Sequence, residues 1–130
     1  MTHRKRVLFV CVENSNRSQM AEAFTRRIGG DHVEALSAGS KPSGKINPKA
    51  IRFMRELGYD LASHSSTSLD DVHGAFDAVV TMGCGDSCPW VPAMRREDWA
   101  LPDPRDMDDD GYRAVRDEIA HRVKALLETL

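Results

Sequence analysis

The stretch that decides the fold is residues 7–24, VLFVCVENSNRSQMAEAF, in which an apolar run reaches a cysteine and a helical pattern begins seven residues later. Residues 7–10 are apolar β-formers without polar alternation, which is typical of a strand buried on both faces of a parallel sheet. From Ser18 onward apolar residues recur at helical spacing, and serine is a common N-cap residue. The pattern therefore predicts a strand, a loop and a helix in direct succession, with Ser18 as the cap.

The loop between these two elements carries Cys11 and Arg17, with five residues between them. A loop that enters a helix N-terminus turns several backbone N–H groups toward one point, where the helix dipole adds positive potential. Arg17 can add a bidentate hydrogen bond to the same anion, and its charge favours the thiolate of Cys11. We therefore expect an oxyanion site above a nucleophile, rather than a structural cysteine and a solvated arginine. The expected anion-binding residues are Val12, Glu13, Asn14, Ser15, Asn16, Arg17 and Ser18.

The rest of the chain alternates strand and helix patterns. The predicted strands are residues 33–38, residues 76–82 and a short strand near Trp99. The predicted helices are one that begins at Asn47–Pro48 and ends at Gly58, a short helical piece at 69–73, and a helix over 112–130 that follows the acidic residues 108–110. This alternation predicts an α/β fold, a three-layer, four-stranded parallel sheet with helices on both faces. Ligands of such folds bind beyond the C-terminal ends of the strands, where Cys11 and the loop after Met82 lie.

Composition narrows the class of protein. With 130 residues, 41% apolar and 29% charged, the chain is predicted to form one globular domain, residues 1–130. A net charge of −2 gives no reason to expect nucleic acid as a partner. No apolar run approaches membrane-spanning length and no signal-peptide core follows the first residues, so we expect a cytoplasmic monomer without a membrane partner.

The cysteines point to redox chemistry. The chain has three, an odd number that argues against a framework of structural disulfides. Cys84 and Cys88 have three residues between them, which is the wrong spacing for a C-x2-C zinc knuckle, and the histidines form no partner pair. We therefore predict no bound metal at these cysteines. His64 is expected to be a hydrogen-bonded loop histidine rather than a catalyst.

An oxyanion reaction also needs a proton donor for the departing oxygen. The candidate is Asp103, which lies between Pro102 and Pro104. The two prolines restrict the backbone that presents this carboxyl group. Taken alone, an Asp-Pro pair more often marks a turn.

Residues 14–24, NSNRSQMAEAF, resemble the low-molecular-weight tyrosine phosphatase superfamily, and most closely the thioredoxin-coupled arsenate reductases of that fold. The resemblance implies a low-molecular-weight tyrosine phosphatase-like architecture and makes Asp103 the general acid. Phosphatases usually continue with proline after Arg-Ser and with tyrosine after Asp-Pro, whereas this chain has Gln19 and Arg105. These departures favour a reductase. So does the segment VVTM followed by two cysteines and Pro89, which is similar to the reductases' redox loop.

The mechanism implied by the resemblance begins with attack of the Cys11 thiolate on arsenate, for which phosphate and sulfate are mimics. Ser18 would stabilise the thiolate and Asn14 would brace the loop. Cys84 would then attack Cys11 and release arsenite. Cys88 would resolve the disulfide into a Cys84–Cys88 pair, which thioredoxin or another redoxin reduces. This makes the expected enzyme an oxidoreductase of arsenical detoxification with a redox-active disulfide and no bound cofactor.

Three alternatives stay open at this point. A tyrosine phosphatase needs only Cys11, Arg17 and Asp103, with water hydrolysing a phosphocysteine. A reductase could use an external small thiol, mycothiol or glutathione with a redoxin, because the gap between Cys84 and Cys88 is shorter than in thioredoxin-linked members. A module that merely binds phosphate would leave those two cysteines unexplained.

Two further positions depart from the family pattern. Asn16 stands where many reductases have a cysteine, although that cysteine is not part of the relay. Some relatives bind potassium near the loop, and Asn14, Glu22 and Ser37 match positions of that site. Thr67 stands about where an acidic ligand would be. A potassium ion is therefore left open.

Overall fold

The computed structural model describes residues 4–83 and 90–130. Within these residues a four-stranded parallel sheet has the order β2-β1-β3-β4, formed by β1 (Lys5–Cys11), β2 (Val33–Gly39), β3 (Ala78–Thr81) and β4 (Arg95–Asp98). The α-helices of the same residues are α1 (Arg17–Gly29), α2 (Pro48–Arg55) and α3 (Asp109–Thr129). Short 3-10 helices are η1 (Gly30–His32), η2 (Leu61–Ser63), η3 (Leu69–Asp71) and η5 (Pro104–Asp106). The predicted α/β fold with a parallel sheet is confirmed.

Strand β1 lies inside the sheet, as its unbroken apolar run predicts. Residues 7–10 are all fully buried. The strand pairs with β2 along its whole length, to the pair Cys11 and Gly39, and with β3 on its other edge. Cys11 therefore lies at the C-terminal edge of the sheet, beside the ends of two neighbouring strands.

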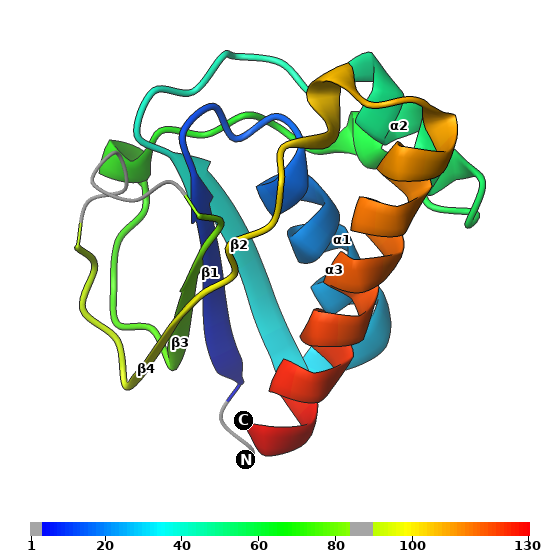
Figure 1. The fold of residues 1–130 in the computed structure, drawn as a ribbon. Helices are drawn as coiled ribbons and strands as arrows, with labels where there is room; N and C mark the ends of the chain where they lie inside the picture. Colours follow the sequence, from blue (N-terminus) through cyan, green and yellow to red (C-terminus); the bar gives the residue numbers. More distant parts are fainter. Residues whose placement is uncertain (1–3, 84–89) are drawn as a thin grey trace.

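The two faces of the sheet are covered differently. Side chains of all three α-helices join the larger core on one face, where Phe9 of β1 contacts Trp99. Figure 1 shows α1, α2 and α3 gathered on this side. On the other face Leu8 and Val10 pack in a smaller core with apolar residues of η3 and of the segments on either side of β3. Packing with α2 and α3 therefore holds α1, and with it the loop after β1, against one face of the sheet.

The ends of the helices follow local sequence signals, with one exception. Asn47 caps α2 by accepting from the Lys49 N–H, and Asp108 caps α3 by accepting from the Gly111 N–H. The predicted cap at Ser18 is wrong, because α1 begins at Arg17 and its N-cap residue Asn16 makes no side-chain cap bond. The Ser18 hydroxyl instead contacts Cys11. The first N–H groups of α1 are thus left without a side-chain cap.

None of the helices in the described part of the chain is both long enough and apolar enough to cross a membrane.

Candidate functional site

The loop between β1 and α1 presents its backbone N–H groups to its own interior. The carbonyls of Cys11, Val12, Glu13 and Ser15 accept hydrogen bonds from the N–H groups of residues 40, 41, 43 and 47. Those of Asn14 and Asn16 accept from the Gln19 side chain and the Met20 N–H. A trans peptide unit points its N–H away from its C=O. Carbonyls that are bound to the surrounding chain therefore turn the N–H groups of residues 12–17 toward the inside of the loop.

The surrounding chain fits closely around this loop. A Cβ atom at Gly39 would lie 2.4 Å from the Val12 carbonyl oxygen, so only glycine allows β2 to end this near. Asn14 has a positive φ of 51°, a conformation that asparagine tolerates better than most residues. Its buried Oδ1 accepts from the Thr67 N–H at 2.8 Å. The loop is therefore held from two sides, as expected for Asn14.

The sulfur of Cys11 lies at the base of this loop. Its Sγ atom is 2.8 Å from the Ser18 hydroxyl and accepts from the Asn14 N–H at 3.2 Å. Cys11 is 5% exposed and is a free cysteine. The Ser18 hydroxyl and the Asn14 N–H thus both lie within hydrogen-bond distance of the sulfur. The expected contact between Ser18 and Cys11 is present.

Behind Ser18, buried side chains form a hydrogen-bond chain that runs to His64. Asn14 Nδ2 donates to Ser18 Oγ at 2.9 Å, and Gln19 Nε2 donates to Asn14 Oδ1 at 3.0 Å. His64 Nδ1 lies 3.0 Å from Gln19 Oε1, and this oxygen can only accept. Because Asn14 occupies an acceptor site of Ser18, the Ser18 hydrogen is free to point at the sulfur. Every donor of the chain is thus directed toward Cys11.

The protonation state of His64 is compatible with this direction. Its side chain is 2% exposed, and burial, with the nearby Arg26, lowers its pKa to about 4. At neutral pH the ring is therefore uncharged, donates through Nδ1 and accepts at Nε2 from the Tyr59 hydroxyl, 2.7 Å away. His64 is a hydrogen-bonded loop histidine, as predicted. Its connection to the cysteine passes through Gln19, which the sequence had marked only as a departure from the phosphatase pattern.

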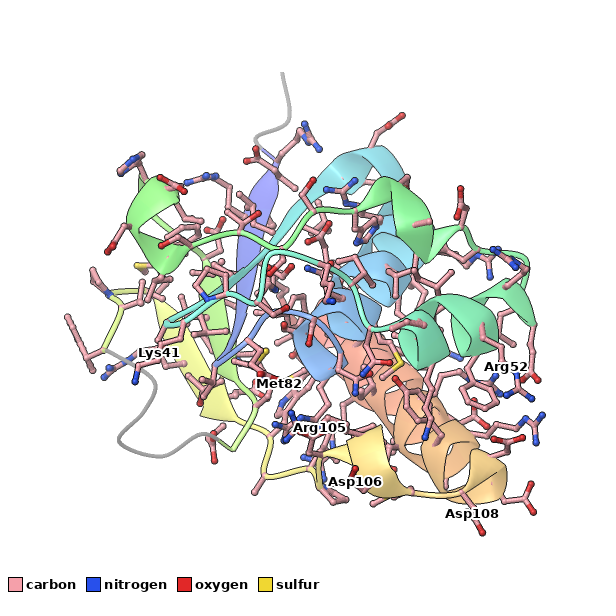
Figure 2. All side chains as sticks on the ribbon, turned by 90° about the horizontal axis from the view of Figure 1, so that it is seen from above. Lys41, Arg52, Met82, Arg105, Asp106 and Asp108 are labelled. Atoms are coloured by element: carbon pink, nitrogen blue, oxygen red, sulfur yellow. The ribbon has the colours of Figure 1, made fainter. Side chains whose placement is uncertain are left out.

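Arg17 connects the loop to the segments that follow β3 and β4. Its Nη1 donates to the carbonyl oxygens of Met82, at 2.8 Å, and of Leu101, at 2.6 Å. Figure 2, which looks onto the C-terminal edge of the sheet, shows Met82 close to the start of α1. Among the described residues no hydrogen bond from Nε or Nη2 is observed.

Asp103 faces the same pocket as the cysteine. A pocket of about 320 Å³ is lined by Cys11, Val12, Glu13, Ser15, Asn16, Arg17, Asp103 and Arg105. Asp103 caps η5 by accepting from the Arg105 N–H at 3.0 Å. The Arg105 guanidinium pairs with Glu13 at 3.1 Å and lies 3.6 Å from Asp103. The fold thus brings the predicted nucleophile, arginine and carboxyl group together around one cavity, which Arg105 also lines.

Two predicted residues cannot be placed. Cys84 and Cys88 lie outside the described residues, so their predicted part in a relay stays a prediction.

Tyr112 is a site residue that sequence reasoning missed. It comes from α3 and donates its hydroxyl hydrogen to Asn16 Oδ1 in the loop. The available signal was a tyrosine in the first turn of an amphipathic helix, which by itself indicates only a core position.

The residues that match a potassium site are engaged within the protein. Glu22 accepts from the Ser37 hydroxyl at 2.6 Å and pairs with Arg26 at 2.7 Å. Burial raises the pKa of Glu22, which disfavours the negative charge that a cation would need. Asn14 Oδ1 already accepts from Gln19 and Thr67. In this arrangement Arg26 supplies positive charge beside the Glu22 carboxyl group, and the possible potassium ion stays a prediction.

Comparison with known proteins gives the same picture as the geometry. The model of the family "Low molecular weight phosphotyrosine protein phosphatase" matches residues 6–130. The chain is 36% identical to the glutaredoxin arsenate reductase of Synechocystis over 127 residues, 95% of this chain and 96% of the relative.

Two solved structures are also similar. An arsenate reductase in the phosphate-binding state superposes with a TM-score of 0.89 at 36% identity, over 96% of this chain and 98% of that one. A thioredoxin-dependent arsenate reductase of Corynebacterium glutamicum superposes with a TM-score of 0.81 at 37% identity, over 97% of this chain and 61% of that one. The chain therefore belongs to the low molecular weight phosphotyrosine protein phosphatase family, and its predicted resemblance to the arsenate reductases of that fold is confirmed.

Proposed function

We propose that this protein is an arsenate reductase that converts arsenate to arsenite through an adduct on Cys11. The observation that carries the proposal is the placement of the Cys11 sulfur beneath a loop of inward N–H groups, in one pocket with Arg17 and Asp103. A tetrahedral dianion matches this set of donors. The similarity to proteins named arsenate reductases over nearly the whole chain supports arsenate as the substrate.

The first step forms a bond between sulfur and arsenic. The Cys11 thiolate attacks arsenic, and one arsenate oxygen departs as water after Asp103 donates a proton to it. The hydrogen-bond chain that ends at Ser18 orients the Ser18 hydroxyl toward the Cys11 sulfur before attack. Arg17, tied to the Met82 and Leu101 carbonyls, keeps its remaining N–H groups over the pocket. Arsenic stays pentavalent in this adduct.

The second step reduces arsenic. The Cys84 thiolate attacks the Cys11 sulfur, the sulfur–arsenic bond breaks, and its electron pair remains on arsenic, which leaves as arsenite. Cys88 then attacks the Cys84 sulfur in the Cys11–Cys84 disulfide and releases the Cys11 thiolate. The two electrons therefore come from Cys84 and Cys88, and a redoxin returns them by reducing the Cys84–Cys88 disulfide. Cys84 and Cys88 are assigned these roles from the sequence alone.

The external reductant is the open part of this proposal. The similar proteins are named for thioredoxin in one case and for glutaredoxin in another. We expect thioredoxin to support turnover through the internal relay. A small thiol such as mycothiol or glutathione, with its redoxin, would instead replace Cys84 as the attacking group.

The test is arsenate-dependent oxidation of NADPH, with thioredoxin and thioredoxin reductase supplied, beside a glutaredoxin or mycoredoxin system. Cys84→Ser should form the Cys11 adduct once and stop. Cys88→Ser should accumulate a Cys11–Cys84 disulfide that peptide mapping detects. Full turnover by both variants with thioredoxin would rule out the relay, whereas turnover with a small thiol alone would keep the reductase and replace the reductant.

Phosphatase activity is the second activity to measure on the same variants, because the family model that matches the chain is that of a phosphatase. Hydrolysis of an aryl phosphate needs Cys11, Arg17 and Asp103, and water suffices to release phosphate from the phosphocysteine. The serine variants of Cys84 and Cys88 should therefore keep whatever phosphatase activity the protein has. Loss of aryl phosphate hydrolysis in both variants would show that these cysteines act in the first step.

A further inference from the structure

The side chain of Asn16 carries a buried hydrogen-bond donor that the proposed chemistry has not used. Asn16 is 7% exposed and lines the pocket above Cys11. Within the described part of the chain, its Nδ2 group is buried and has no acceptor. Buried polar groups are rarely left without a partner, and each exception requires an explanation. An anion bound in this pocket would supply such an acceptor.

Helix α3 fixes which end of this amide is free. The Tyr112 hydroxyl donates to Asn16 Oδ1, so the amide carbonyl is occupied and the NH2 group is not. Tyr112 is fully buried and its ring stacks on Phe53 with centroids 4.8 Å apart, which leaves the hydroxyl little freedom. Burial, with the negative charge of Asp103, raises the pKa of Tyr112. The hydroxyl therefore stays protonated and continues to donate.

As a hydrogen-bond donor, the side chain of Asn16 differs from a cysteine at the same position. A thiol is a weak hydrogen-bond donor, whereas a carboxamide offers two N–H groups. Asn16 is also the N-cap residue of α1 but makes no side-chain cap bond. Its amide is thus neither capping the helix nor paired with the protein through Nδ2. What remains for Nδ2 is a bond to something that enters the pocket.

We propose that Asn16 Nδ2 is a direct oxyanion ligand, donating to an oxygen of the bound arsenate or phosphate beside the loop N–H groups and Arg17. Tyr112 is then a positioning residue, which acts through the Asn16 amide. The inference rests on the proposed function only for the anion site. It has a specific signature, because an unpaired buried donor destabilises the empty protein and is satisfied when the anion binds.

The experiment is titration of inorganic phosphate into the full chain by calorimetry, with thermal unfolding measured in the absence of phosphate. The double variant Asn16→Leu/Tyr112→Phe removes the amide and the hydroxyl together, and leucine keeps the branching of the asparagine side chain although its two methyl groups are larger. Its phosphate Kd should rise about 10- to 100-fold, as expected for the loss of a hydrogen bond to a charged group. Its melting temperature without phosphate should equal or exceed that of the unsubstituted protein.

Two controls separate a ligand from a structural role. Tyr112→Phe alone keeps the amide, so its phosphate Kd should rise less than that of the double variant. Asn16→Cys, which replaces the amide with the weaker hydrogen-bond donor of a thiol, should also raise the Kd if the double variant does not fold. An unchanged Kd in the folded variants would overturn the proposal, as would a melting temperature that falls together with affinity. If the unsubstituted protein binds no phosphate, the anion site itself is wrong, and this inference fails with it.

Discussion

The buried His64 predicts a loss of stability in weak acid that one substitution should remove. In the folded protein burial lowers the pKa of His64 to about 4, against 6.5 for an ordinary histidine. As the pH falls from 6.5 toward 4, the unfolded chain binds a proton that the folded protein does not, so the free energy of unfolding decreases. Above pH 6.5 neither state binds this proton, and the contribution of His64 to stability is fully present.

The size of the effect follows from the difference between the two pKa values. At pH 5 the contribution of His64 to the free energy of unfolding is about 1 to 2 kcal/mol smaller than at pH 7.5, after allowing for partial screening by solvent. Neighbouring charges must be counted with it. Glu22 has the opposite effect on stability in acid. Because its pKa is raised in the folded protein, the folded protein binds a proton at a higher pH than the unfolded chain does, and the free energy of unfolding increases as the pH falls. Arg26 adds to the lowering of the His64 pKa, and Asp60, which favours the charged ring, opposes it.

The assay is urea unfolding followed by circular dichroism at pH 5, 6 and 7.5. The variant His64→Asn keeps a neutral donor near Nδ1 and removes the titrating ring. The unsubstituted protein should lose stability between pH 7.5 and pH 5 by about 1 to 2 kcal/mol more than the variant does. Equal pH dependence in the two proteins would show that His64 is not held neutral in the folded state, and the proposed direction of the hydrogen-bond chain would then be wrong.

Three other substitutions test the pocket itself. Arg17→Ala should weaken phosphate binding by about 1.5 to 3 kcal/mol, and unchanged affinity in a folded variant would remove the anion site from this loop. Asp103→Asn should slow arsenate turnover by roughly 10² to 10⁴ in rate while phosphate affinity, measured by calorimetry, stays near that of the parent; equal turnover with chemistry rate-limiting would assign the acid elsewhere. Arg105→Ala breaks an exposed pair with Glu13, so urea unfolding should show a change below about 1 kcal/mol, and a larger loss would mean that this pair supports the loop.

The parts of the fold that could be read from the sequence are those governed by neighbouring residues. The apolar run at 7–10, the Asn47–Pro48 start of α2 and the Asp108 cap of α3 depend on side-chain pattern and on hydrogen bonds within one turn. The centre of the site belongs to this class, because Cys11 and Arg17 are placed by one strand, one loop and one helix. The cap at Ser18 was predicted wrongly, since the sequence does not show that its hydroxyl has a better partner in the Cys11 sulfur.

The rest of the site depends on contacts between residues far apart in the chain. Gln19 meets His64 across 45 positions, Asn16 meets Tyr112 across 96, and Arg17 reaches the Leu101 carbonyl across 84. Periodicity and spacing in the sequence do not predict such pairs. The pairs form only when the strands align their C-terminal ends at one edge of the sheet and the helices pack against it. From the sequence, Cys11 is predicted as the nucleophile and Arg17 as a ligand of the anion that it attacks. The packed molecule alone shows which buried amide, hydroxyl and ring orient them, since burial removes water as a competing partner for these polar groups.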